Sequence, residues 1–377
     1  MRPVTVARYG EIGTKSGRVQ KNMEAVLRQR VNDKLEHEGL QPEKVYTRES
    51  RIIAEVEDNK EAANAVQLLP GIKSCSPAYQ TEPDLEQVKD ASEKFEYGET
   101  FGVDPHTGNT ELSSRKIAEE IGEHVENFSG AGVDLDNPDT WLRVDMRNQE
   151  AYVFTEKLEG PGGFPSGTNG KYAALVSGGI DSPVAAYETM TRGADIVLVY
   201  FYNRPIAAED HLMRFRAAAE KLKNFHPGKK WKAYRVDMED VNKRLMEVQR
   251  GRMVMHRIIM FRVAEKIAEK EGLNGIITGE SLGQKSSQTA ENLQATTQSI
   301  DTPVLRPLIA MDKDSITQKA REIDTFEEAK INSACRSLSP EQPATRLKDE
   351  KLDELVSMIE EEGLAEEAWR STDIFEV

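Results

Sequence analysis

The chain alternates between short apolar segments and amphipathic ones, and the pattern changes at residues 159–170. Before that segment, "VTVARYG" (4–10) predicts a strand, and residues 16–38 predict a helix because their apolar residues recur every three or four positions. The other predicted elements are a strand at 51–57, helices at 58–69, 84–97 and 111–128, and a hairpin at 140–156 that turns at 147–149. This mixture predicts an α+β region.

After residue 170, the predicted strands are apolar throughout and alternate with helices. The strands lie at 172–176, 195–201, 231–236, 275–279 and 303–309, and the helices at 183–192, 208–223, 239–271 and 313–323. Such alternation is typical of a parallel, doubly wound α/β sheet. Ligands of these sheets bind at the carboxyl ends of the strands. The residues at that edge are 177–182, 200–204, 279–288 and 302–307.

The two regions meet at "EGPGGFPSGTNG" (159–170). Its five glycines and two prolines cannot continue a helix or a central strand. We therefore expect a boundary here, with a linker between two folded parts.

A candidate anion site opens the second region, in "ALVSGGIDSPVAA" (173–185). Ser177, Gly178 and Gly179 would expose backbone N–H groups between a strand and a helix, and Ser182 with Pro183 predicts the helix start as N-cap and first helical residue. The lysine of the G-x-x-x-x-G-K-[ST] phosphate loop is absent. A carboxylate such as Asp181 is unfavourable in an anion site unless a cation is shared, which predicts Mg²⁺.

Composition narrows the functional classes. Hydrophobic residues make up 38% and charged residues 31%, which favours globular cores. No apolar run reaches the ~20 residues that cross a bilayer, and the start lacks a signal peptide, so we expect a soluble, cytoplasmic protein. Two cysteines and six scattered histidines argue against a zinc or iron–sulfur site. The net charge of −15 argues against a polyanionic partner. Alternatively, the acidic surface is an adaptation to a salty cytoplasm, and basic patches remain only where they bind a partner.

Five motifs in a fixed order carry a family resemblance. They are "RYGEIGTKSGR" (8–18), "SGGIDS" (177–182), "TGESLGQKSSQTAENL" (278–293), "LRPLIAMDKDSI" (305–316) and a lone cysteine after "REIDTFEEA" (321–329). The motif "SGGIDS" resembles the PP-loop of the ATP pyrophosphatases, which adenylate an oxygen and release pyrophosphate. Together the motifs resemble the tRNA 4-thiouridine synthetase (tRNA sulfurtransferase) family over essentially the whole chain.

The resemblance implies a domain order. An α+β ferredoxin-like domain would occupy residues 1–75 and a THUMP tRNA-binding domain 76–160. A linker at 161–170 would lead to a parallel, doubly wound PP-loop (adenine nucleotide alpha hydrolase-like) domain at 171–377.

The resemblance also implies an ATP site with Mg²⁺. The residues that would bind the nucleotide are Leu175, Val176, Ser177, Gly178, Gly179, Ser182, Tyr200, Phe201, Arg257, Gly279 and Gln288. Asp181 would be the metal ligand and a catalytic group, and Lys313 would stabilise the adenylation transition state. Asp301 and Arg306 match charged positions near the family's active site, and Glu280 is a candidate for metal or ribose binding.

The lone cysteine of the fifth motif is Cys335, the third catalytic candidate. In the family, sulfur attacks an adenylated uridine at C4, and a thiolate is the competent nucleophile. Many bacterial members add a rhodanese-like domain that delivers the sulfur, and we expect this chain to lack one. Free sulfide, an external persulfide and a carrier protein all remain open as donors. Cys75, in a strand-like stretch, is expected to be structural.

Partners follow from the same resemblance. The tRNA would contact two local basic clusters, made of Arg8, Lys15, Arg18, Lys21, Lys116, Arg143 and Arg147. Family members act as homodimers, so we expect a homodimer here.

Three classes of function fit the motifs: tRNA thiolation, other PP-loop or sulfur-transfer chemistry, and tRNA binding without catalysis. The first is an ATP-dependent tRNA sulfurtransferase that adenylates O4 of uridine 8, replaces it with sulfur, and releases AMP and pyrophosphate. The second is a PP-loop ligase or amidotransferase that acts on a small molecule, or sulfur transfer for thiamine thiazole synthesis. The third is a tRNA-binding protein with a decayed nucleotide site, which the intact S-G-G-x-D-S motif disfavours.

Overall fold

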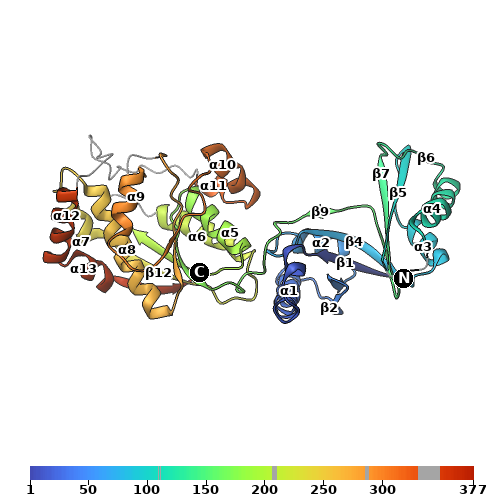
Figure 1. Ribbon diagram of the computed structural model, residues 1–377, viewed down its shortest axis with the longest axis horizontal. Coiled ribbons are helices and arrows are strands. Elements are labelled where there is room, and N and C mark those ends of the chain that lie inside the picture. Colours follow the sequence, from blue (N-terminus) through green and yellow to red (C-terminus); the bar gives the residue numbers. More distant parts are fainter. Residues whose placement is uncertain (109, 111, 206–209, 285–287, 330–348) are drawn as a thin grey trace. The chain divides into compact units, whose positions relative to one another are not determined.

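The computed structural model consists of two compact units, Met1–Pro165 and Ser166–Val377 (Figure 1). It describes all residues except 109, 111, 206–209, 285–287 and 330–348. The segment 159–170 is divided between the units. Its first half bonds to the first unit, where Gly71 N–H donates to Gly162 O at 2.7 Å, and its second half bonds to the second, where Gly167 N–H donates to Gly193 O at 3.0 Å.

The first unit is built on one nine-stranded sheet. Its order is β2-β3-β1-β4-β8-β7-β5-β6, and β9 also pairs with β4. The pairings of β5 with β6 and β7 are parallel and the others antiparallel. The strands are β1 (Arg2–Arg8), β2 (Lys44–Arg48), β3 (Arg51–Glu55), β4 (Ser74–Thr81), β5 (Thr100–Thr107), β6 (Gly132–Val133), β7 (Thr140–Met146), β8 (Ala151–Phe154) and β9 (Leu158–Glu159).

Four helices and a short 3₁₀ turn, η1 (Glu11–Thr14), accompany this sheet. The helices are α1 (Gly17–His37), α2 (Asn59–Val66), α3 (Leu85–Ser92) and α4 (Ser114–Ser129). The first two pack on the β1–β3 end of the sheet and the last two on its β5–β8 end. Helix α4 has clear sequence signals at both ends: the Ser113 hydroxyl accepts the Lys116 N–H, and Gly130 ends the helix at φ +74°.

The second unit contains a six-stranded sheet of order β14-β13-β10-β11-β12-β15. The strands are β10 (Lys171–Leu175), β11 (Asp195–Tyr202), β12 (Lys232–Asp237), β13 (Gly275–Ile277), β14 (Val304–Leu305) and β15 (Thr372–Glu376). All pairings are parallel except that of β15 with β12. The carboxyl ends of β10, β11, β13 and β14 therefore meet at one edge.

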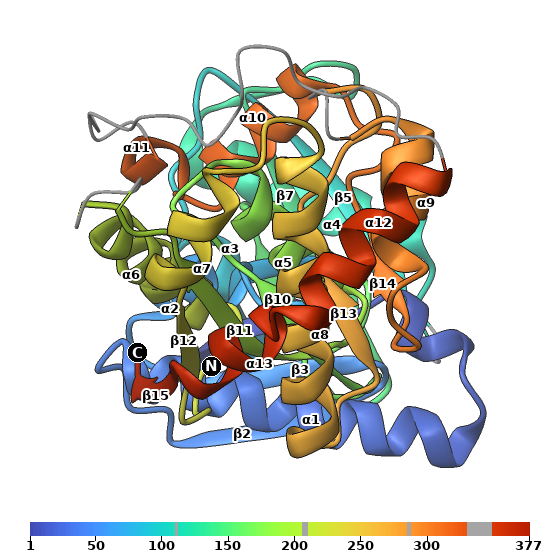
Figure 2. The same ribbon diagram turned by 90° about the vertical axis from the view of Figure 1, so that its left-hand side faces the viewer.

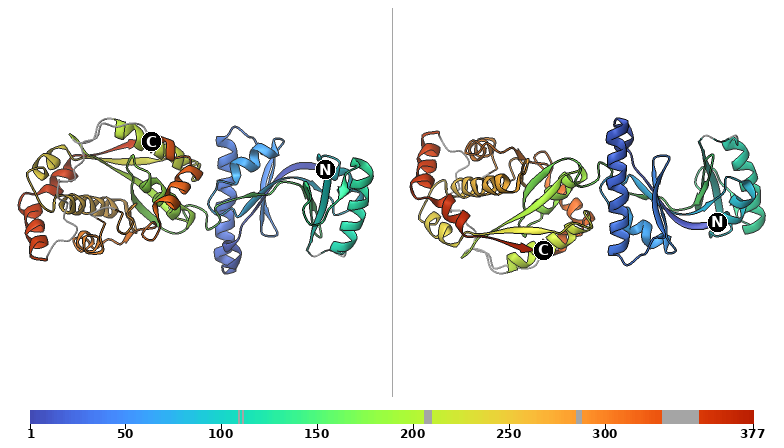
Figure 3. Two further views of the ribbon diagram at one scale, coloured as in Figure 1. Left: turned by 90° about the horizontal axis from the view of Figure 1, so that it is seen from above. Right: turned by 90° about the horizontal axis from the view of Figure 1, so that it is seen from below.

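Helices cover both faces of this sheet, as a doubly wound fold requires. One layer contains α5 (Asp181–Thr191), α6 (Asp210–Lys223), α10 (Lys313–Glu322) and α11 (Phe326–Ala329). The other contains α7 (Glu239–Leu245), α8 (Arg252–Glu271), α9 (Ala290–Thr297), α12 (Asp349–Glu361) and α13 (Leu364–Arg370). Figure 2 shows α8 and α13 in front of the strands, and Figure 3 shows the red helices α12 and α13 on the α8 side.

Most predicted elements are confirmed, including the hairpin at 140–156, in which Met146 pairs with Ala151. The elements that the sequence pattern did not predict include β2, β5, α9 and β15. The predicted strand at 303–309 is reduced to β14, because Arg306–Ile309 closes a turn in which Ile309 N–H donates to Arg306 O at 3.1 Å. Among the described residues, no helix is long and apolar enough to cross a membrane.

Phe215 offers a test of the second unit's core. Its side chain is 0% exposed and its ring lies 4.7 Å from that of Tyr200 and 6.1 Å from that of Phe375. Phe215→Ala should lower the free energy of unfolding by about 3–5 kcal/mol, because the substitution removes buried apolar surface and leaves a cavity. Urea denaturation measures the loss. Met213→Ala is the matched control on the same helix, because Met213 is 68% exposed; equal losses in both variants would contradict this packing.

Candidate functional site

The loop between β10 and α5 is held by its own hydroxyl groups. The Ser177 N–H donates to Ser182 Oγ at 2.8 Å, the two serine hydroxyls are 3.1 Å apart, and the Gly179 N–H donates to Ser177 Oγ at 3.2 Å. The prediction that Ser182 caps the helix is wrong. Helix α5 begins at Asp181 with Ile180 before it, so Ser182 lies in the first turn and its hydroxyl holds the loop instead.

Two glycines allow the loop to pack between its neighbours. A Cβ on Gly178 would lie 2.6 Å from Cβ of Arg214 on α6, and a Cβ on Gly279 would lie 2.8 Å from the backbone of Asp181 and Ser182. These distances are shorter than real carbon contacts. Only glycine therefore lets the segment after β13 press against the start of α5.

A cavity of about 330 Å³ lies next to this loop. Its walls come from the loop, from the residues after β11 and β13, and from one face of α8, whose lining residues recur at helical spacing. The lining residues are Leu175, Ser177, Gly179, Asp181, Ser182, Asn203, Met253, His256, Arg257, Met260, Phe261, Thr278, Gly279, Glu280 and Gln288. Met253, Met260 and Phe261 give the cavity an apolar wall opposite the polar loop.

Charged side chains around the cavity are paired. Lys313 Nζ lies 2.5 Å from Asp181 Oδ1. The buried carboxylate of Glu280 accepts from Arg257 through one oxygen and from Arg306 Nε at 2.8 Å through the other. Burial lowers the pKa of Arg257, while the charge of Glu280 opposes that shift. The group of Glu280 with its two arginines has one net positive charge beside the loop.

His256 is a cavity residue that the sequence reading missed. Its Nε2 lies 2.8 Å from Asn203 Oδ1, and burial, with a smaller contribution from Arg257, lowers its pKa to about 4. The imidazole is therefore neutral at pH 7, so one ring nitrogen can donate a hydrogen bond and the other can accept one. Its position on the α8 face, beside Arg257, was the signal available in the sequence.

Most of the predicted nucleotide-binding residues lie around the cavity. Val176, Tyr200 and Phe201 do not line it with their side chains; they pack in the core layers at the strand ends. Gly178 contacts α6. The sequence-derived role of each residue stays a prediction, and Cys335 lies outside the described residues.

The first unit contains a second cavity, of about 490 Å³, on the sheet face opposite its helices. Strand alternation places charged residues there. Val6 of β1 and Ile53 of β3 mark that face, and Arg8 and Arg51 lie two positions from them on the same strands. The charged lining residues are Arg8, Arg51, Lys73, Asp104, His106, Arg143, Asp145 and Lys157. Cations outnumber carboxylates, so the cavity attracts anions.

Arg8 and Arg143, which the sequence placed in separate clusters, meet in this cavity. Arg8 lies over the Phe154 ring at 4.7 Å, and burial, together with the charges of Arg51 and Arg143, lowers its pKa while Asp145 opposes the shift. Arg147 bonds to the cavity residue Asp145 at 2.7 Å. The other predicted basic residues are exposed on η1, α1 and α4 or next to them: Lys15, Arg18, Lys21 and Lys116. Arg51, Lys73 and Lys157 were missed because no sequence motif contains them.

Three family models match consecutive parts of the chain. They are described as ThiI ferredoxin-like domain (residues 4–76), THUMP domain (83–156) and thiamine biosynthesis protein, ThiI (167–360).

Named proteins and solved structures are similar along the whole chain. A probable tRNA sulfurtransferase of Halobacterium salinarum is 39% identical over 90% of this chain and 89% of its own. The tRNA sulfurtransferase of Thermoplasma acidophilum is 37% identical over 96% and 75%. The crystal structure of a 4-thiouridine synthetase–RNA complex with bound ATP matches with a TM-score of 0.88 at 32% identity, covering 100% of both chains.

The neutral state of His256 predicts a pH effect on stability. The folded pKa of about 4 lies below the unfolded value of ~6.5, so the unfolded chain binds more protons between these values. The contribution of His256 to stability is complete above about pH 6.5 and is lost as the pH falls to about 4. We expect the free energy of unfolding of wild type to fall by about 3 kcal/mol more than that of His256→Gln over this range. Urea unfolding at several pH values measures it; parallel curves would refute it.

Proposed function

The chain belongs to the thiamine biosynthesis protein (ThiI) family, and from this membership we propose how its two units thiolate tRNA. It is a tRNA sulfurtransferase, and the predicted resemblance, fold class and enzyme activity are confirmed. The assignments of individual residues, the metal, the sulfur donor and the oligomeric state that follow are our proposals.

ATP binds in the cavity beside the β10–α5 loop in this proposal. The observation that carries it is the Ser177–Asp181 loop, which sits at the amino end of α5, lines the cavity and has no side chain at Gly179. The amino end of a helix attracts phosphate oxygens through its dipole and the N–H groups of its first turn. The apolar wall of α8 would contact the adenine ring, and backbone groups near Tyr200 and Phe201 would read its edge.

Asp181 and Lys313 form an ion pair that triphosphate binding would rearrange. Asp181 would hold Mg²⁺, which would supply charge neutralisation on the phosphates, because one carboxylate plus substrate phosphates is an ordinary magnesium site. Lys313 Nζ, at 2.5 Å from Asp181, would then exchange the carboxylate for phosphate oxygens. Among the described residues, no cluster of three His, Cys, Asp or Glu side chains could hold a metal ion.

The proposed reaction has two steps. The O4 of uridine 8 attacks the α-phosphorus, pyrophosphate leaves, and the uracil N3 proton is released. Sulfide then attacks C4, the C4–O bond breaks, and AMP leaves with the oxygen, which gives 4-thiouridine without an oxidant or reductant. With a persulfide donor, a thiol must cleave the sulfur–sulfur bond, and the family assigns this chemistry to the position of Cys335.

The cationic cavity of the first unit would bind the tRNA backbone. Guanidinium and ammonium groups contact phosphates without reading sequence, so this cavity positions the RNA. Arg8 and Arg143 are the proposed central contacts, with Lys157 at the rim. The exposed cations of η1, α1 and α4 would extend the contact, and we propose that the enzyme acts in the cytoplasm as a homodimer.

A reconstitution experiment tests this function. Purified protein is incubated with unmodified tRNA, Mg-ATP and sulfide at low and high salt, and the digested RNA is analysed by mass spectrometry. We expect 4-thiouridine, AMP and pyrophosphate, each dependent on tRNA. Release of AMP and pyrophosphate without thiolation would support adenylation and require a dedicated sulfur donor. The absence of all three products under every salt condition would overturn the proposal.

Asp181 provides a direct test of the nucleotide site. Asp181→Asn should lower the rate of tRNA-dependent pyrophosphate release by at least about 100-fold, because the triphosphate loses its metal anchor. Glu188→Gln is the matched control, because Glu188 on the same helix pairs with Lys319 of α10 at 2.8 Å but lies outside the cavity. Normal release by Asp181→Asn would remove the assignment of this loop.

Lys157 tests the cationic cavity. Lys157→Ala should weaken tRNA binding to a similar extent for all tRNAs and reduce the slope of log K against log salt concentration by about one, since one phosphate contact is lost. Filter binding over a salt series measures this slope. Lys60→Ala on α2, whose helix packs on the other face of the sheet, is the control and should keep the wild-type slope. The same slope for Lys157→Ala and wild type would place the RNA elsewhere.

A further inference from the structure

We propose that Glu280 is a positioning residue: it orients Arg257 toward the β10–α5 loop and does not bind the metal. This inference rests on the proposed function, because it assigns Arg257 to the charge that develops on the α-phosphate. It replaces the interpretation of Glu280 as a metal or ribose ligand.

The backbone fixes where the Glu280 side chain begins. Glu280 follows β13 by three residues, and Gly279 before it presses against the start of α5. The Ser281 hydroxyl after it donates to Met311 O at 3.0 Å. Glu280 therefore leaves a segment that is held on both sides, so its carboxylate has a defined position next to the loop.

Parallel strand pairing brings the two arginines to this carboxylate. Ile277 of β13 pairs with Leu305 of β14, and Arg306 follows β14 directly, so Glu280 and Arg306 emerge side by side at the same sheet edge. Arg257 approaches from the second turn of α8. Three elements far apart in the sequence thus converge on one carboxylate.

Both oxygens of the Glu280 carboxylate already accept from a guanidinium, so a metal bound there would lie beside two cations. Glu280 is 3% exposed; Oε1 accepts from Arg257 and Oε2 from Arg306 Nε at 2.8 Å. A buried guanidinium that loses its carboxylate is left uncompensated beside a second cation. Metal binding at Glu280 would place a further cation against these two buried guanidinium groups, whereas at Asp181 it has to displace only the half-exposed Lys313.

In the reaction, Glu280 would keep the guanidinium of Arg257 in one orientation. It holds Arg257 against the repulsion of Arg306, whose charge also lowers the pKa of Arg257. With Glu280 in place, the guanidinium of Arg257 keeps one orientation at the cavity wall, where preorganised charge stabilises a transition state most effectively. Without Glu280, the Arg257 guanidinium stays positively charged, but its orientation is no longer fixed.

The test compares Glu280→Gln, Glu280→Asp, Arg257→Gln and the double variant Glu280→Gln/Arg257→Gln. Each is assayed for tRNA-dependent pyrophosphate release over series of ATP and Mg²⁺ concentrations. We expect Glu280→Gln to lower kcat by about 10- to 100-fold with an unchanged Mg²⁺ midpoint, the range typical of residues that orient a functional group. Adding Glu280→Gln to Arg257→Gln should not lower kcat any further, because Glu280 acts through Arg257.

Three results would overturn the inference: wild-type kcat in Glu280→Gln, a raised Mg²⁺ midpoint that excess Mg²⁺ rescues, or full additivity in the double variant. If Glu280→Gln does not fold, Glu280→Asp retains the charge but shortens its reach, and it should show the same fall in kcat at an unchanged midpoint. Inactive wild type would refute the proposed function itself, which is a separate outcome.

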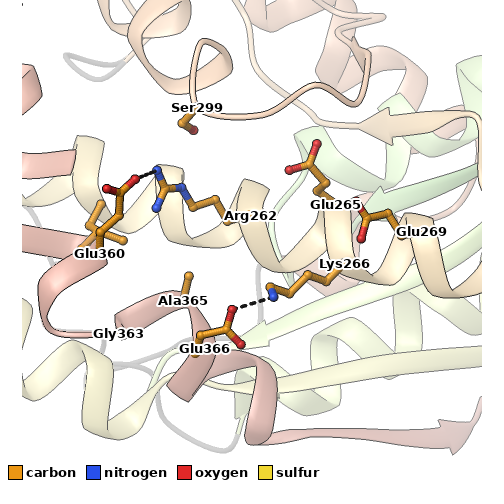
Figure 4. Close-up of a pocket in the computed structure, with 10 residues that line it drawn as sticks. Arg262, Glu265, Lys266, Glu269, Ser299, Glu360, Gly363, Ala365 and Glu366 are labelled. Carbon is orange, nitrogen blue, oxygen red and sulfur yellow. Dashed lines mark hydrogen bonds and ion pairs between the residues drawn. The ribbon is translucent and has the colours of Figure 1, made fainter. Parts of the chain in front are cut away.

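A matched control lies on the same helix. Arg262 of α8 pairs with Glu360 of α12 at 3.0 Å, beside the pair of Lys266 with Glu366 (Figure 4). Glu360 is 61% exposed and lies outside the nucleotide cavity. Glu360→Gln removes a carboxylate from an α8 arginine as Glu280→Gln does, yet it should leave kcat and the Mg²⁺ midpoint at wild-type values.

Discussion

The close backbone approach between Gly279 and the first turn of α5 is the constraint on which the second unit's site depends. A side chain at Gly279 would lie 2.8 Å from the backbone of Asp181 and Ser182, so the contact exists only with glycine. It joins the ends of β10 and β13 and places Glu280 beside the anion loop. The contact therefore holds Asp181 and Glu280 near each other, and β14 and α8 then bring Arg306 and Arg257 to Glu280.

Charged side chains are buried and paired around the cavity but remain partly exposed on the surface. Around the cavity, Glu280 and its two arginines are buried and mutually oriented, so the geometry of each group is fixed. On the outer face of α8, pairs such as Arg262 with Glu360 are partly hydrated, and exposed pairs of this kind contribute little to stability. An overall acidic chain can therefore keep a cationic group beside the β10–α5 loop and, in its first unit, a cationic cavity on one sheet face.

The sequence alone determined the fold class, most elements and the residue types of the β10–α5 loop. Hydrophobic periodicity distinguishes buried parallel strands from amphipathic helices, because both patterns follow from local backbone geometry. Hydrophobic periodicity did not predict β15, because its alternation is weak and pairing with β12 sets its place. It also predicted that the strand β14 continues through residues that form a turn. The family motifs carried the resemblance and therefore the activity.

Tertiary structure decided which side chains meet. Arg8 and Arg143 lie 135 positions apart and share a cavity because β1, β4, β8 and β7 are consecutive in one sheet. Glu280 and Arg306 meet for the same reason, because β13 and β14 are neighbours in the second sheet. The sequence by itself determined which chemical groups are available and which local structures they form. Their orientation was decided only by strand order and burial, because contacts between distant segments depend on long-range packing that no local pattern records.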